Sequence, residues 1–207
     1  MGELVRLFNQ FKSDEGRYLH KITSYANVYE KWLNKFIGTE VYLVELGILH
    51  GGCLQMWRTY LGSKAYIYGM DHRDNLLYEE PQIKCFLIDQ DIQADLDSIH
   101  QKVPRIDIFI DDASHFGRNQ IATFEAVISH ISYGGLYFCE DTHTSYRDTH
   151  EGGYLKSGTA MEFFKGLTDS LNYPENTSIY RPDYINSIES ITFYRSLIVV
   201  KKCEALT

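Results

Sequence analysis

The chain has 207 residues, with 28 acidic and 20 basic side chains, which leaves a formal net charge of −8 at pH 7 when histidine is neutral. This length suggests one domain with a sizeable hydrophobic core. Phosphate backbones and anionic lipids attract positive charge, so the acidic balance argues against nucleic acid and membranes as partners. The four cysteines are widely spaced, and the N-terminus has no apolar stretch of signal-peptide length. Both features predict a cytoplasmic protein with reduced thiols.

The first forty residues are predicted to be helical. Aromatic and aliphatic side chains recur there at steps of three and four, which is typical of one helix face packed into a core. These residues are Tyr18, Ile22, Tyr25, Tyr29, Trp32 and Phe36. We expect a single domain over residues 1–207, in which a helical segment (1–40) precedes a doubly wound core (41–207).

From residue 41 onward, short apolar runs alternate with single helical stretches. The predicted strands are Val41–Leu46, Ala65–Met70, Lys84–Ile88, Ile106–Ile110 and Gly135–Cys139, and the helices between them include Leu54–Leu61, Ile92–Gln101 and Gln120–Ile131. Such alternation builds a parallel sheet with helices on both faces.

Two final runs, Ser190–Tyr194 and Ser196–Lys201, are too close in sequence for a parallel crossover and must form an antiparallel hairpin. The pattern therefore predicts an α/β fold with a doubly wound, seven-stranded mixed sheet. This is the fold of the class I S-adenosylmethionine-dependent methyltransferases.

Ligands of open α/β sheets bind beyond the carboxyl ends of the strands. The first strand runs into an E-x-G-x-x-x-G-G turn formed by Glu45, Gly47, Gly51 and Gly52. Its glycines permit close approach of a ligand, whereas the acid would repel phosphate and attract an ammonium group. Asp71, at the end of the second strand, is placed to accept ribose hydroxyls. A nucleoside with an amino-acid tail fits both features, and S-adenosylmethionine is the expected cofactor.

A second acidic group follows the fourth and fifth strands and consists of Asp112, Glu140 and Asp141. Clustered carboxylates repel one another unless a cation is bound or some are protonated. Oxygen ligands without cysteine favour Mg²⁺ or Mn²⁺ over zinc. The alternative is structural, with an aspartate capping the next helix and Glu140 paired with a surface base.

His115 and His143 accompany these two acidic motifs. Imidazole titrates near neutral pH and is the usual general base beside a reacting hydroxyl. Because of this position, both are candidate catalytic residues.

At these residues the sequence resembles the metal-dependent sugar O-methyltransferases that act on macrolide and related glycosides. Rhamnosyl O-methyltransferases and cephalosporin-tailoring methyltransferases are more distant relatives. The resemblance extends from about Ser13 to Lys202 in ordered blocks, which include SDEGRYLHKITSYANVYE, VELGILHGGCLQMWRTYL, YGMDHRD, DDASHFGRNQ, GGLYFCEDTHTSY, MEFFKGLTDSLN and SITFYRSLIVVKK.

The resemblance implies a Mg²⁺-dependent enzyme that methylates a sugar hydroxyl of a glycoside and that assembles as a homo-oligomer. Gly47, Gly51 and Gly52 would line the S-adenosylmethionine pocket, with Asp71 on the ribose. The remaining cofactor contacts would come from Asp89, Gln90 and Asp111. Asp112, Glu140 and Asp141 would hold the metal, with His115 as catalytic base and His143 near the substrate.

Three other interpretations remain open. A catechol-like diol would chelate the same metal as vicinal sugar hydroxyls. A non-haem iron oxygenase would use His115, His143 and one of the aspartates as iron ligands, although such sites usually lie on β-barrels. The third is an inactive module that binds S-adenosylmethionine.

Overall fold

The computed structural model describes residues 2–12, 17–172 and 182–205. The chain divides into two compact units, an N-terminal unit from Met1 to Asp89 and a C-terminal unit from Gln90 to Thr207. Each unit has its own strands and helices. The single domain expected over residues 1–207 stays a prediction.

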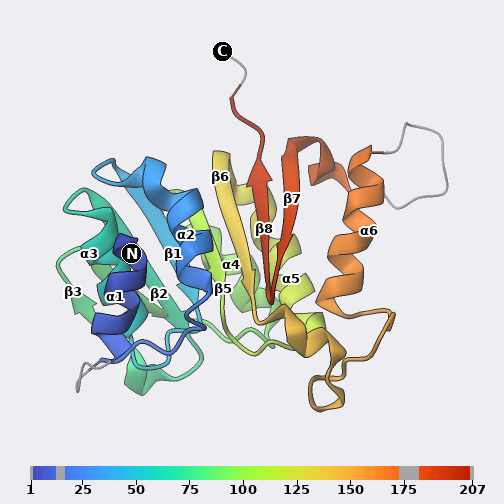
Figure 1. The fold of residues 1–207 in the computed structure, drawn as a ribbon, viewed down its shortest axis with the longest axis horizontal. Helices are drawn as coiled ribbons and strands as arrows, with labels where there is room; N and C mark the ends of the chain where they lie inside the picture. Colours follow the sequence, from blue (N-terminus) through green and yellow to red (C-terminus); the bar gives the residue numbers. More distant parts are fainter. Residues whose placement is uncertain (1, 13–16, 173–181, 206–207) are drawn as a thin grey trace. The chain divides into compact units, whose positions relative to one another are not determined.

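Parallel strands form the centre of the N-terminal unit (Figure 1). In the sheet of this unit, β2 (Ala65–Asp71) pairs in parallel with β1 (Val41–Leu46) on one side and with β4 (Ile83–Leu87) on the other. The two-residue β3 (Glu79–Glu80) runs antiparallel to β4. Five of the six residues of β1 are buried, as expected for a parallel strand that is covered on both faces. The parallel register brings the carboxyl ends of these strands to the same edge.

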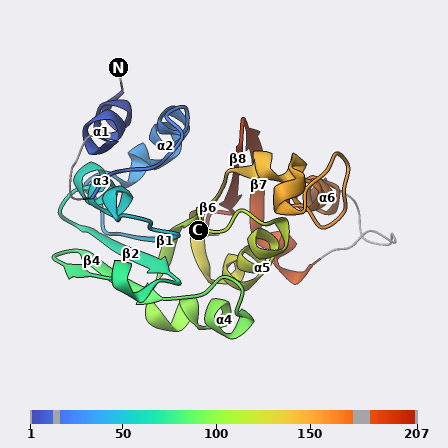
Figure 2. The same cartoon turned by 90° about the horizontal axis from the view of Figure 1, so that it is seen from below.

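Three helices of this unit contact one another: α1 (Glu3–Lys12), α2 (Tyr25–Leu33) and α3 (Gly52–Leu61). Figure 2 shows them grouped on one side of β1, β2 and β4. The ring of Tyr29 in α2 meets the indole of Trp57 in α3 edge-on, with centroids 4.9 Å apart. Two short 3-10 helices, η1 (Asn34–Phe36) and η2 (Asp74–Leu76), complete the unit.

The predicted helix face is wrong before residue 25, because α2 begins only at Tyr25. Tyr18 and Ile22 are 38% and 40% exposed, whereas Tyr25 is buried. Arg17 and Tyr18 instead pass the N-terminus of α3 so closely that a Cβ on Gly52 would lie 2.5 Å from the carbonyl oxygen of Arg17. This crossing depends on contacts distant in sequence, which a local periodicity does not contain.

The C-terminal unit combines one parallel pair with an antiparallel hairpin. β5 (Ile106–Asp111) and β6 (Ile131–Glu140) are parallel, β8 (Leu197–Lys202) is antiparallel to β6, and β7 (Ile188–Tyr194) is antiparallel to β8. The predicted hairpin and all seven predicted strands are confirmed. The described residues contain eight strands rather than seven, since the short β3 carries no apolar pattern that would reveal it.

The main helices of this unit are α4 (Gln93–Lys102), α5 (Gly117–Val127) and α6 (Ala160–Asn172). They form an arc along one side of the strands (Figure 2). Phe124 of α5 packs edge-on against Tyr137 of β6 and against Phe164 of α6, with centroids 5.0 Å away in both cases. Neither α6 nor the short helices η3 (Ile128–His130), η4 (Thr142–Tyr146), η5 (Asp148–His150) and η6 (Asp183–Ser187) were predicted.

All of the helices are short. With 13 residues, α6 is the longest in the described part of the chain, whereas about 20 residues are needed to cross a bilayer. None of the described helices is long and apolar enough to span a membrane.

Candidate active site

The predicted glycine turn joins β1 to α3 in the N-terminal unit. Gly47 and Gly51 have φ angles of 92° and 77°, in the left-handed region that glycine adopts without a steric penalty. The amide of Gly47 donates to the carbonyl of Met70 at 2.7 Å, which anchors the turn to the end of β2. A Cβ on Gly51 would lie 2.8 Å from the ring of Tyr78. The turn therefore places backbone amides and a helix N-terminus beside the carboxyl ends of the strands.

Asp71 ends β2 and is 4% exposed. Its carboxylate accepts hydrogen bonds from the amide of Ile48 at 3.2 Å and from the amide and guanidinium of Arg73 at 3.0–3.3 Å. Burial acts to raise the pKa of Asp71, but these hydrogen bonds outweigh it, and the pKa lies below its ordinary value. Asp71 is therefore held as an anion at the position predicted for a ribose contact. Asp89, two residues beyond β4, is partly exposed.

Glu45 in β1 is fully buried and already has a cationic partner. The ammonium of Lys21 lies 2.7 Å from Glu45 Oε1, and the indole of Trp57 donates to Oε2 at 3.0 Å. The side chain of Lys21 is only 1% exposed, so this is a buried ion pair. The ammonium that Glu45 contacts in the structure belongs to Lys21, and its contact with the cofactor stays a prediction.

In the C-terminal unit, the end of β6 and the loops after β5 and β6 carry four of the predicted residues, which we name the acidic cluster: Asp112, His115, Glu140 and Asp141. Ligand atoms of Asp112, His115 and Asp141 lie within 4.8 Å of one another, and Asp112 and Glu140 approach within the same distance. His115 Nε2 lies 3.6 Å from Asp141 Oδ2 and 3.9 Å from Asp112 Oδ1.

The backbone of the acidic cluster is strained. His115 and Asp141 have φ angles of 60° and 53°, which are uncommon for residues other than glycine and are maintained by surrounding structure. The hydroxyl of Thr144 lies 2.8 Å from the carbonyl oxygens of both residues. Because Thr144 is 3% exposed, this hydroxyl ties the two strained backbones together inside the unit.

Asp111 and Gln90 support the same loop from within. The Gln90 amide donates to Asp111 Oδ1 at 2.9 Å, while its carbonyl oxygen accepts from the amide and hydroxyl of Ser114 at 3.0 and 2.7 Å. The phenol of Tyr137 donates to Asp111 Oδ2 at 3.0 Å. Burial raises the pKa of Asp111 to about 7 despite these hydrogen bonds. Both residues, predicted to contact the cofactor, brace the loop that carries Asp112 and His115.

His143, the second predicted catalytic histidine, lies in η4 and is not a member of the acidic cluster. Its Nδ1 is buried and has no hydrogen-bond partner among the residues that the structure describes. His115 lies in the acidic cluster and His143 does not, and the catalytic roles of both histidines stay predictions.

The acidic cluster fits a hard divalent cation. The carboxylates of Asp112 and Asp141 converge with the imidazole of His115, Glu140 lies near Asp112, and the group contains no thiolate. Oxygen-rich sets of this kind suit Mg²⁺ or Mn²⁺. Mutual repulsion of the carboxylates would also be relieved by a cation bound among them.

Known proteins are similar in sequence to most of this chain. No family model matches the chain. The 8-demethyl-8-alpha-L-rhamnosyl tetracenomycin-C 2'-O-methyltransferase of Streptomyces olivaceus is 30% identical over 192 residues, 87% of this chain and 50% of the relative. The mycinamicin VI 2''-O-methyltransferase of Micromonospora griseorubida is 28% identical over 214 residues, 97% of this chain and 52% of the relative.

A crystal structure agrees with these sequence matches. The MycE methyltransferase from the mycinamycin biosynthetic pathway, in complex with Mg, SAH and mycinamycin VI, superimposes with a TM-score of 0.84 and 26% identity over 98% of this chain and 54% of that one. The homologues of this chain are sugar O-methyltransferases. This confirms both the predicted resemblance and the predicted class I methyltransferase fold. The chain spans about half the length of these sugar O-methyltransferases.

Three residues that form hydrogen bonds or ion pairs with predicted site residues were not predicted from the sequence. Lys21, Thr144 and Ser114 all lie inside quoted motif blocks but were given no role. A lysine or threonine carries no local sign of burial, and only the fold reveals what it contacts.

Proposed function

We propose that this chain is an S-adenosylmethionine-dependent and Mg²⁺-dependent O-methyltransferase that acts on a sugar hydroxyl of a glycoside. The observation that carries the proposal is the acidic cluster, in which Asp112, His115 and Asp141 converge within 4.8 Å. The resemblance to a methyltransferase whose structure contains Mg, SAH and a macrolide supports it. The curated relatives that act on rhamnosyl and macrolide compounds favour a glycoside as acceptor.

The N-terminal unit would supply the main contacts to the cofactor. Backbone amides of Gly47, Gly51 and Gly52 would face it, and Asp71 would accept hydrogen bonds from the ribose hydroxyls. The side chain of Arg73, 41% exposed, would have to leave Asp71 for the ribose to take its place. Asp89 would lie near the adenine.

Asp112, Glu140 and Asp141 would hold the metal. When bound, a divalent cation lowers the pKa of hydroxyl groups that chelate it, which makes vicinal sugar hydroxyls easier to deprotonate. His115 Nε2 would accept the proton of the reacting hydroxyl. The positive charge that His115 then gains lies 3.6 and 3.9 Å from two carboxylates, which compensate it.

Calorimetric titration with S-adenosylmethionine and methyl-transfer assays on deoxysugar glycosides, with Mg²⁺ and with chelator, test this proposal. Wild-type protein should bind the cofactor. It should transfer methyl groups only in the presence of the metal. His115→Ala should bind S-adenosylmethionine as before and turn over about a hundredfold more slowly or worse. The matched control is His100→Ala, an exposed residue of α4, which should keep the wild-type rate.

Absence of cofactor binding in the wild type would refute the methyltransferase proposal as a whole. A wild-type rate in His115→Ala would remove only the general-base role. The expected homo-oligomer and cytoplasmic location stay predictions, and light scattering would test the former.

A further inference from the structure

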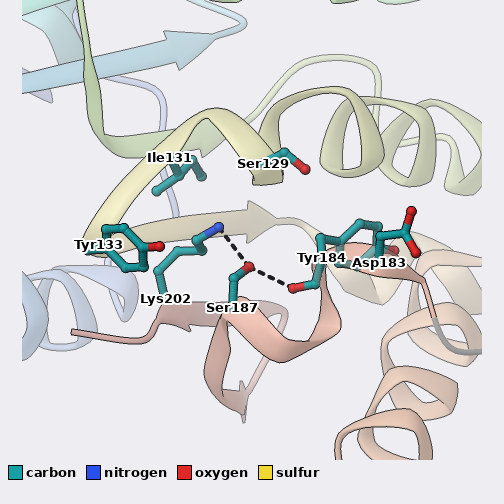
Figure 3. Close-up of a pocket in the computed structure, with 7 residues that line it drawn as sticks. All are labelled: Ser129, Ile131, Tyr133, Asp183, Tyr184, Ser187 and Lys202. Atoms are coloured by element: carbon teal, nitrogen blue, oxygen red, sulfur yellow. Dashed lines mark hydrogen bonds between the residues drawn. The ribbon is translucent and has the colours of Figure 1, made fainter. Parts of the chain in front are cut away.

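A cavity of about 330 Å³ lies in the C-terminal unit around the end of β8 (Figure 3). Its polar lining comes from η3, β6, η6 and β8 and consists of Ser129, Tyr133, Asp183, Tyr184, Ser187 and Lys202. Ile131 at the start of β6 also lines it, whereas Glu140 of the acidic cluster ends the same ten-residue strand. The cavity is therefore at the opposite end of β6 from the acidic cluster.

Lys202 is the buried cation of this cavity and is 5% exposed. Its ammonium donates to the hydroxyl of Ser187 at 2.7 Å and to the carbonyl oxygen of Ile128 at 3.1 Å. Both partners are neutral, and within the described ranges Lys202 forms no ion pair. An ammonium has three donor hydrogens, so one remains for another acceptor.

The neighbouring residue in β8, Lys201, differs from Lys202 because carboxylates compensate its charge. Lys201 is paired with Glu189 at 2.8 Å and with Glu204 at 3.1 Å. A buried charge is costly unless an opposite charge compensates it. Burial lowers the pKa of Lys202, which expresses the same cost. An anion bound in the cavity would compensate the charge of Lys202 and so remove this energetic cost.

We propose that this cavity binds a small carboxylate ligand, with Lys202 as its counter-ion. Tyr133 also lines the cavity, and its hydroxyl, which faces Lys202 in Figure 3, would donate to the second carboxylate oxygen. Figure 3 shows Lys202 with Ser187 at its ammonium and Tyr133 alongside. Asp183, which is exposed on the lining, disfavours a second negative charge, so a monoanion is preferred to a phosphate dianion.

Thermal unfolding with increasing acetate, at constant ionic strength, tests this site. A ligand that binds only the folded state raises the midpoint in a saturable way. Wild type and the control Lys201→Met should both respond, while Lys202→Met, which keeps the length of the side chain but not its charge, should bind acetate about tenfold more weakly or not at all. Phosphate should give a weaker saturable response than acetate.

Two outcomes would overturn the proposal: no saturable response in the wild type, or equal responses in wild type and Lys202→Met. If Lys202→Met fails to fold, acetate titration of the wild type by amide NMR decides. Shifts confined to residues 129–133, Ser187 and Lys202 support the site, and shifts elsewhere refute it.

Discussion

The two units differ in the partners that surround the acidic side chains at and near their strand ends. In the N-terminal unit each buried acid has a basic partner from the same unit: Glu45 lies 2.7 Å from Lys21, and Asp71 lies 3.0 Å from Arg73. In the C-terminal unit, Asp112 and Asp141 approach each other beside His115, and Glu140 lies near Asp112. In the N-terminal unit the chain itself supplies the positive charge that compensates each buried acid, whereas the acidic cluster of the C-terminal unit is suited to an added cation.

Both regions contain left-handed backbone. The N-terminal turn takes positive φ at Gly47 and Gly51, where it costs little, and also at Leu49, which has a φ of 45°. The acidic cluster takes it at His115 and Asp141, where strain of about 1–3 kcal/mol each must be compensated. Strain of this kind is typical of functional sites, and here it sets the direction of two predicted site residues.

The largest expected effect is the loss of the cation. Asp112→Asn should weaken Mg²⁺ binding and slow methyl transfer by about a hundredfold or more, since Asp112 is close to every other member of the acidic cluster. Mg²⁺ titration and a rate assay measure this. Asp97→Asn, on the exposed face of α4, is the control. If Asp112→Asn bound Mg²⁺ as tightly as the wild type, the acidic cluster would not be the metal site that distinguishes the C-terminal unit from the N-terminal unit.

Removing the basic partner of a buried acid in the N-terminal unit should instead reduce the free energy of unfolding. Lys21→Met leaves the carboxylate of Glu45 buried without its cation, which should cost about 3–5 kcal/mol of unfolding free energy. Denaturant unfolding measures this, and the double variant Lys21→Met/Glu45→Gln should recover most of the loss. A single variant as stable as the wild type would show that Glu45 does not need Lys21.

Loss of the Thr144 hydroxyl should have an intermediate effect. Thr144→Val keeps the shape but removes the one hydroxyl hydrogen that the part-buried carbonyl oxygens of His115 and Asp141 share, at a cost of about 1 kcal/mol. If Thr144 positions His115 and Asp141, Mg²⁺ affinity should also fall about tenfold in the folded variant. Thr149→Val, at an exposed position, is the control. A loss of stability with wild-type Mg²⁺ affinity would limit Thr144 to a structural role.

The smallest effect concerns pH. The pKa of Asp71 is lowered in the folded protein, so its ionised form stabilises the fold above the ordinary value of 3.8, and this contribution is lost as the pH falls through the lowered value. Asp71→Asn should be less stable than wild type by on the order of 1 kcal/mol near neutral pH, and the gap should close in acid. Unfolding curves over pH measure the gap. The control Asp74→Asn should show none, and a gap that persists in acid would contradict the ionic explanation.

Much of the fold could be predicted because strands are local patterns. The apolar runs at 41–46 and 106–110 coincide with β1 and β5 to within one residue. The prediction of a helix from Tyr18 was wrong, because the backbone of Arg17 and Tyr18 packs against the N-terminus of α3, a contact distant in sequence. The short β3 has two glutamates and no apolar signal.

The acidic cluster was predictable for a topological reason. Residues that follow neighbouring parallel strands meet at one edge of the sheet, so Asp112 and Asp141 were expected to converge. The resemblance gave His115 and His143 different roles, but the strained backbone at His115 could not be predicted, since it depends on Thr144 and on the loop after β6.

The sequence by itself determined the strand order along the chain, the C-terminal hairpin and the acids at the strand ends, because alternation and spacing are properties of the chain. Only the tertiary structure decided which charges are compensated. Lys21 reaches Glu45 from 24 residues away in the chain (45 − 21), Asp112 meets Asp141 across a strand and a helix, and Lys202 lies buried beside neutral partners. The energy of a charge depends on its burial and its neighbours. The net charge of −8 argues against nucleic acid and membranes as partners, whereas only the fold brings Asp112 and Asp141 close enough to suit a divalent cation.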